Sequence, residues 1–174
     1  METFVSKLFE WAWDIAEKYI FFWVICREYE GGVILLFGRY HYSLKPGRLN
    51  FKIPLIHESL TCLIKSETIE SRPFTVTTKD KKTVSITLIG QYQVTDTRKW
   101  LLNANDAASN AMHHLINVAS DYITGYDMEK VKKETAYTPI RKELNKVIEY
   151  LGAEFLMIGY GSVCETRPIS LINH

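Results

Sequence analysis

Short turns separate apolar runs along the stretch Arg27–Pro54, and this order constrains the fold more than any other feature of the sequence. The run Val33–Phe37 is rich in β-branched and aromatic residues and ends at a glycine, which is typical of a buried strand. Pro46-Gly47 fits the centre of a type II turn, because proline fixes φ and glycine accepts a positive φ. The stretch contains no phosphate loop or metal cluster, so it indicates a structural scaffold rather than a catalytic loop.

Extended periodicity continues on both sides of this run. Trp23–Tyr29 and Val33–Phe37 flank the glycine pair in Glu30–Gly32, and the pattern predicts that they pair as a β-hairpin around it. Ser59–Ile69 is the next strand candidate, because apolar residues alternate loosely within it.

The clearest strand is Thr83–Val94, in which apolar and polar residues alternate. This pattern predicts a strand in a sheet with one buried and one wet face. The predicted buried face consists of Val84, Ile86, Leu88, Gly90, Tyr92 and Val94.

A charged turn precedes this strand and contains Lys79, Lys81 and Lys82. The ordinary interpretation is a solvated hairpin loop. The alternative is that the three lysines contact the phosphate head groups of lipids.

Helical spacing of apolar residues returns after residue 96. Asp106 and Thr138-Pro139 are start signals for two helices, and Gly125 and Gly152 are the matching stop signals. The pattern predicts helices over 98–102, 106–124, 127–133 and 138–152 and a final strand over 154–158, which 160–163 can extend.

Residues 3–25 are predicted to form an amphipathic helix of about six turns. Apolar side chains recur at steps of three and four and share one face, whereas charged residues fall mostly on the other faces. This apolar stripe, a candidate membrane or subunit interface, consists of Phe4, Leu8, Trp11, Ile15, Tyr19, Phe22 and Trp23.

Three roles are open for this helix: it can lie in the membrane interface, pack on the domain or a neighbouring subunit, or span a bilayer. Acidic residues interrupt it and no cleavage site follows, so it is not a signal peptide. Spanning is disfavoured because the longest apolar run, Tyr19–Cys26, is much shorter than the roughly 20 residues that a bilayer requires. Asp14 and Glu17 would each cost about 2.5–3.5 kcal/mol near the bilayer centre.

Several classes of function are disfavoured by composition and spacing. The net charge of +1 offers no basic field for nucleic acid. The three cysteines are far apart, which excludes a simple disulfide framework and fits a reducing compartment. His113 and His114 are adjacent and would point about 100° apart on a helix, so they cannot chelate one ion. We therefore expect no enzyme, no metal and no cofactor.

The order of these motifs resembles the SPFH domain of stomatins, prohibitins, flotillins and the HflK/HflC pair, and it is most similar to the stomatin branch. The resemblance covers about residues 23 to 165. The motifs that carry it are Glu28-Tyr29-Glu30, Gly38-Arg39-Tyr40, Leu44-Lys45-Pro46-Gly47, Phe51–Ile56, Thr78-Lys79-Asp80 and Tyr92–Asp96.

The resemblance implies an α+β fold with a curved, largely antiparallel sheet from the first half, helices packed on it from the second half, and the amphipathic helix in front. The expected division is an N-terminal helix over 1–25, an SPFH-like domain over 26–166 and a tail over 167–174. The resemblance also implies side-by-side oligomerisation, and it implies that the domain has no catalytic residues. Relatives continue into a long coiled coil, and no sustained heptad occurs here, so we expect a minimal SPFH protein without the tall cage wall.

The expected function is a non-enzymatic oligomeric scaffold on the cytoplasmic side of a membrane. Its expected partners are copies of itself, the membrane surface and other SPFH proteins. The alternative is a structural assembly subunit, for example of a virus or phage particle, in which the N-terminal helix packs between subunits.

Overall fold

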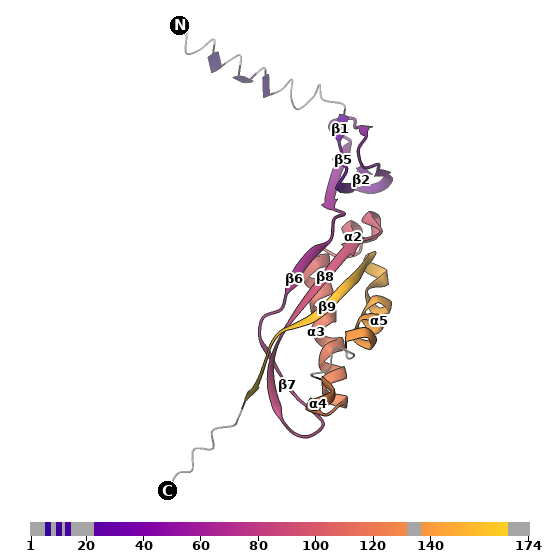
Figure 1. Ribbon diagram of the computed structural model, residues 1–174. Helices are drawn as coiled ribbons and strands as arrows, with labels where there is room; N and C mark the ends of the chain where they lie inside the picture. Colours follow the sequence, from indigo (N-terminus) through magenta and orange to yellow (C-terminus); the bar gives the residue numbers. More distant parts are fainter. Residues whose placement is uncertain (1–5, 8–9, 12, 15–22, 132–136, 167–174) are drawn as a thin grey trace. The chain divides into compact units, whose positions relative to one another are not determined.

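The computed structural model describes residues 6–7, 10–11, 13–14, 23–131 and 137–166 (Figure 1). The chain divides into two compact units, residues 1–65 and residues 66–174. Every strand pair described in either unit is antiparallel, and helices accompany the strands of the second unit. The predicted α+β class is therefore confirmed, with the described strands arranged in three sheets.

The first unit contains a two-stranded ribbon and a three-stranded sheet. In the ribbon, β1 (Trp23–Ile25) pairs with β4 (Leu49–Phe51). In the sheet, β2 (Glu30–Leu36) lies between β3 (Arg39–Leu44) and β5 (His57–Leu63).

The predicted hairpin of Trp23–Tyr29 with Val33–Phe37 is wrong. The hairpin instead joins β2 to β3 through Phe37 and Gly38, whose φ angles of 48° and 73° are both positive, as a type I′ turn requires. The glycines that indicated a turn lie inside β2. Gly32 is needed there for close packing, because a Cβ atom at this position would lie 2.3 Å from the carbonyl oxygen of Leu60.

Two other sequence predictions for this region have different outcomes. Gly47 has a φ of 68°, the positive value that the predicted Pro46-Gly47 type II turn needs, and its N–H donates to the Cys26 carbonyl at 2.9 Å. The single strand predicted over Ser59–Ile69 is wrong, because β5 ends at Leu63 and a separate strand begins at Glu67 in the second unit.

The core of the first unit includes a cluster of Cys26, Ile34 and Leu44, with Val24 and Tyr42 packed against it. Residues alternate between the two faces of a strand. Because Val24 points to this cluster, its neighbours in β1 point away from it.

The long strand β8 (Thr83–Val94) organises the second unit. It pairs with β6 (Glu67–Glu70) and β7 (Phe74–Thr77) near its two ends and with β9 (Ala153–Thr166) over its whole length. The predicted bounds of β8 are confirmed, and every residue of its predicted buried face is buried.

Helices α3 (Ala107–Gly125) and α5 (Tyr137–Ile148) lie on one side of this sheet (Figure 1). The shorter elements are α2 (Thr97–Leu102), α4 (Met128–Val131) and the 3₁₀ turn η2 (Glu149–Leu151). The predicted cap is confirmed, because the Asp106 carboxylate accepts the Ser109 N–H at 2.9 Å.

The buried face of α3 differs from the predicted one by about one position. The structure buries Ala107, Ala111, Leu115, Ala119 and Ile123, whereas the predicted face was Ala108, Ala111, Met112, Leu115, Val118 or Ala119, and Tyr122. Leu115 of α3 approaches β8 closely at Gly90. A Cβ on Gly90 would lie 3.1 Å from Leu115 and 2.5 Å from the Phe155 ring. The stripe predicted for α5 was Ile140, Leu144, Val147, Ile148 and Leu151. It is confirmed at every position except Val147, which is exposed, and Leu151 lies in η2.

Of the predicted N-terminal helix, the structure describes Ser6, Lys7, Glu10, Trp11, Trp13 and Asp14, which are all in helical conformation. Phe4, Leu8, Ile15, Tyr19 and Phe22 lie outside the described residues. The helix was predicted to continue to residue 25, and this end is wrong because Trp23 begins β1, where it is paired with Phe51. In the described part of the chain, no helix is long and apolar enough to cross a membrane.

Replacement of Gly152 by alanine should destabilise the second unit by about 2–4 kcal/mol. Gly152 follows η2 with a φ of 73°, and a Cβ there would lie 2.5 Å from the Asp96 carbonyl oxygen. The measurement is urea denaturation followed by circular dichroism. Gly125→Ala is the control, because nothing lies within 4 Å of its Cβ position; equal stability of the two variants would contradict this account.

Candidate interaction surfaces

An exposed apolar face lies on the β1–β4 ribbon. Trp23 is paired with Phe51 and Ile25 with Leu49, and residues directly opposite in a strand pair project to the same side. The alternation of β1 turns this side away from the core cluster. Each side chain is more than half exposed, from 52% for Trp23 to 72% for Ile25. We call Trp23, Ile25, Leu49 and Phe51 the ribbon face.

Two further apolar side chains stand at turns of the same unit. Phe37 is 75% exposed and Leu55 is 81% exposed, and both have positive φ, at 48° and 77°. The left-handed conformation costs a non-glycine residue about 1–2 kcal/mol. The Phe37 N–H donates to the Ile56 carbonyl at 3.0 Å, which holds the two turns together. We call Phe37 and Leu55 the tip pair.

Residues 23–65, which carry these side chains, have an excess of positive charge. Residues 23–65 contain six basic residues and three acidic ones, whereas residues 66–174 contain thirteen of each. The six basic residues are Arg27, Arg39, Lys45, Arg48, Lys52 and Lys65. Two of them contact one half-buried aromatic ring, since Lys65 Nζ lies 4.4 Å from the centre of the Tyr29 ring and Arg27 Nη1 donates to its hydroxyl at 2.6 Å.

The predicted lysine turn is the loop between β7 and β8. Lys82 Nζ lies 3.4 Å from the Asp80 carboxylate, so one of the three lysines is paired. The Thr78 hydroxyl donates to Asp80 and is the main reason that the pKa of this carboxyl is lowered. The Lys79 N–H donates to the Tyr126 carbonyl after α3, which fastens the loop to the helix. Contact of Lys79, Lys81 and Lys82 with lipid head groups stays a prediction.

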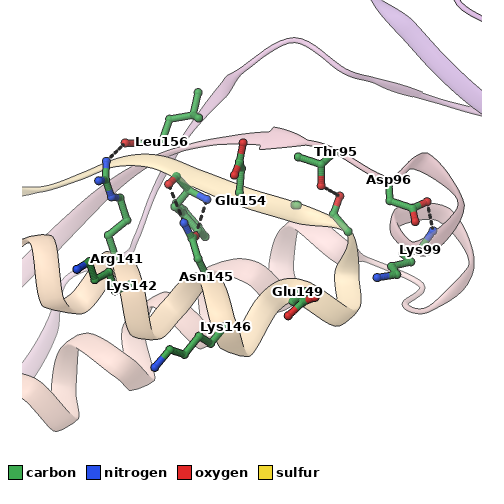
Figure 2. Close-up of a pocket in the computed structure, with 13 residues that line it drawn as sticks. Thr95, Asp96, Lys99, Arg141, Lys142, Asn145, Lys146, Glu149, Glu154 and Leu156 are labelled. Carbon is green, nitrogen blue, oxygen red and sulfur yellow. Dashed lines mark hydrogen bonds between the residues drawn. The ribbon is translucent and has the colours of Figure 1, made fainter.

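A groove lies between α5 and the start of β9 in the second unit (Figure 2). Its lining carries both signs of charge, so it offers no consistent field for an anion or a cation. The charged side chains along it include Lys99, Arg141, Lys142, Lys146, Glu149 and Glu154.

Two polar side chains in this groove bond to the backbone at the edge of the sheet. Asn145 donates to the Phe155 carbonyl at 3.2 Å and accepts the Phe155 N–H at 2.8 Å, as a neighbouring strand would (Figure 2). Arg141 donates to the carbonyl of Leu156 at 2.7 Å. The β8–β9 register shifts at this point and leaves Leu156 without a partner in β8. The groove is therefore mainly a structural junction that protects a sheet edge.

Comparison with known proteins identifies the fold. The family model described as SPFH domain / Band 7 family matches residues 24–155, which is most of the chain and begins within β1. The chain belongs to this family.

Two curated relatives match this SPFH domain. An uncharacterized protein of Methanocaldococcus jannaschii is 32% identical over 83 residues, which are 48% of this chain and 41% of that protein. Protein HflK of Haemophilus influenzae is 25% identical over 141 residues, which are 78% of this chain and 34% of that protein. The matched part of the chain thus spans less than half the length of either relative.

The described part of this SPFH domain brings together no three histidine, cysteine, aspartate or glutamate side chains that could hold a metal ion. His114 Nε2 lies 3.1 Å from the Tyr150 hydroxyl, and His113 is exposed. The buried Cys26 thiol donates to the Glu30 carbonyl at 3.1 Å, and burial, aided by Glu30, raises its pKa. A raised pKa favours the unreactive thiol.

Sequence reasoning missed the ribbon face as a unit. The sequence pattern places Trp23 in the stripe of the N-terminal helix and gives Ile25, Leu49 and Phe51 no role in an interface. A signal was present in the apolar residues of 49–55, but their exposure depends on pairing with β1, which is distant in sequence. Asn145 and Arg141 carry no periodic signal at all.

Asn145→Ala should lower the free energy of unfolding by about 1–3 kcal/mol, because it leaves the Phe155 N–H and carbonyl without these partners. Lys142→Ala, an exposed neighbour on α5, should change it by less than about 0.5 kcal/mol. Chemical denaturation of both variants provides the measurement. A loss at Asn145 no larger than that at Lys142 would show that the junction is not structural.

Proposed function

We propose that this SPFH domain protein is a non-enzymatic scaffold that associates with a membrane surface through the ribbon face and tip pair of its first unit. The observation that supports the proposal most directly is the exposure of Trp23, Ile25, Leu49 and Phe51 on one paired ribbon. Contiguous exposed apolar patches mark interaction sites in soluble domains. Aromatic side chains are also the residue type enriched at the headgroup level of bilayers.

The energetics support shallow insertion. Full burial of one large apolar side chain contributes about 1.5–3 kcal/mol, so partial burial of the ribbon face and tip pair together gives several kcal/mol. Each basic residue near an anionic surface adds about 1 kcal/mol. The net positive charge of residues 23–65 therefore acts in the same direction as the apolar residues.

The strained turns strengthen this proposal. A glycine at position 37 or 55 would avoid the cost of positive φ, yet the chain has a large apolar side chain at both positions. Insertion of Phe37 and Leu55 into an apolar phase would offset the cost of their positive φ, whereas exposure of these side chains to water does not. In this arrangement the remaining stripe of the N-terminal helix, including Trp11, would lie in the same interface.

Assembly and location complete the proposal. Similarity to Protein HflK and to the family supports lateral packing with copies of this chain or with other SPFH proteins. We place the protein on the cytoplasmic side of a membrane, with no nucleic-acid partner. The alternative is a structural subunit, possibly of a virus or phage particle, in which a neighbouring subunit covers the ribbon face.

Replacement of Phe51 and Leu49 by serine should reduce binding to vesicles containing anionic lipid at least tenfold, the factor that corresponds to about 1.4 kcal/mol. The measurement is flotation of the full chain with increasing lipid. The control is Met157→Ser, because Met157 is 63% exposed but lies on β9 of the second unit. This control should leave flotation unchanged.

Two results would contradict the proposal. One is equal flotation of the Phe51/Leu49 double variant and the parent protein. The other is that neither the parent protein nor the double variant binds vesicles, and that the parent forms a lipid-free oligomer that the double substitution dissociates. This result would favour the structural-subunit alternative.

A further inference from the structure

The loop that carries Leu55 is closed by two hydrogen bonds between the same two residues. The Ile53 N–H donates to His57 Nδ1 at 2.9 Å, and the His57 N–H donates to the Ile53 carbonyl at 3.0 Å. Between them Leu55 has a φ of 77° and is 81% exposed. The conformation of this part of the tip pair therefore depends on a histidine side chain.

The first of these bonds requires a particular protonation state of His57. A neutral imidazole can accept at Nδ1 when the proton is on Nε2, whereas an imidazolium has a proton on both nitrogens and can only donate. A proton on Nδ1 would face the Ile53 N–H, so the bond would be replaced by a donor–donor contact. Histidine is the side chain that ordinarily makes this change between about pH 5 and 8.

The surroundings of His57 contain further groups that respond to charge. The His41 ring of β3 stacks on it, with ring centres 5.7 Å apart and planes 24° apart, and Tyr42 lies edge-on to His41 at 5.2 Å. The charged groups on the neighbouring segments are Arg39 in β3, Glu58 in β5 and Lys52, whose Nζ donates to the Ser59 hydroxyl at 3.3 Å.

We propose that His57 is a proton-operated latch that holds Leu55 in its docking conformation and releases it in acid. This inference rests on the proposed membrane function and adds its regulation. When His57 is neutral, the two hydrogen bonds hold the loop and keep Leu55 at positive φ. When His57 is protonated, the loop opens at Ile53, Leu55 relaxes to an ordinary negative φ, and the apolar tip is lost. Docking through apolar contacts is therefore stronger when His57 is neutral and weaker when it is protonated.

The latch is tested first without lipid. The measurement is amide hydrogen exchange of the full chain by NMR, corrected for the intrinsic pH dependence of exchange. Protection of the Ile53 N–H should fall about tenfold from pH 8 to pH 5, a factor in the range expected for the loss of one ordinary hydrogen bond. His57→Asn places an amide oxygen near the Nδ1 position and does not titrate, so Ile53 should stay protected at both pH values. His41→Asn should retain the pH dependence, because His41 does not bond to the loop. Ile53 protection that is independent of pH in the parent protein would overturn the proposal.

The functional part is tested on vesicles of zwitterionic phosphatidylcholine, so that added histidine charge does not strengthen binding. Flotation of the parent protein should be weaker at about pH 5 than at about pH 8, and flotation of His57→Asn should be the same at both. If the parent protein binds vesicles equally at both pH values although Ile53 protection falls, His57 does not control vesicle binding, and this part of the proposal is wrong. If neither the parent protein nor Leu55→Ser binds vesicles at either pH value, the proposed membrane association is wrong. The regulatory inference is then wrong with it.

Discussion

The pairing of Trp23–Ile25 with Leu49–Phe51 is the interaction on which the proposed activity depends. It turns Val24 toward the core cluster and, by strand alternation, leaves four large apolar side chains exposed on the other side. The pairing is non-local, and the Gly47 N–H and Arg48 carbonyl bond to Cys26 beside it, so the turn and the ribbon support one another. A change that separates β1 from β4 would remove the ribbon face without touching its side chains.

The two units differ in the hydrogen bonding of their polar groups and in the exposure of their apolar side chains. In the second unit, exposed strand groups are satisfied internally: Asn145 and Arg141 bond to the edge of β9, and Asp96 and Asp106 cap helices. The first unit instead presents apolar side chains and keeps Phe37 and Leu55 in a costly backbone conformation. The exposed ribbon and the two strained turns support the proposal that the first unit makes the contacts. The bond from Ile53 to His57 then makes one of those contacts sensitive to protonation.

Local signals in the sequence predicted β8 and several helix ends of the second unit, but not β7 or the full length of β9. Alternation along Thr83–Val94 defined β8, and the cap at Asp106 and the stop at Gly152 defined helix ends, because each depends on residues close in sequence. The pairing of β1 with β4 could not be predicted, since a hairpin with Val33–Phe37 fits the same pattern. Gly32 was taken for a turn residue because sequence does not reveal the approach of Leu60. The bonds of Asn145 and His57 depend on side-chain positions that no periodicity encodes.

Membrane association through the ribbon face is tested most directly by the immersion depth of this face in a bilayer. Spin labels at Leu49 and, separately, at Met157, each in a background with Cys62 and Cys164 replaced by serine, would be compared with and without vesicles by their accessibility to oxygen and to a water-soluble nickel chelate. We expect the label at Leu49 to gain oxygen accessibility and to lose nickel accessibility on vesicles, whereas the label at Met157 should be unchanged. A label at Leu49 that stays accessible to nickel on vesicle-bound protein would contradict this expectation.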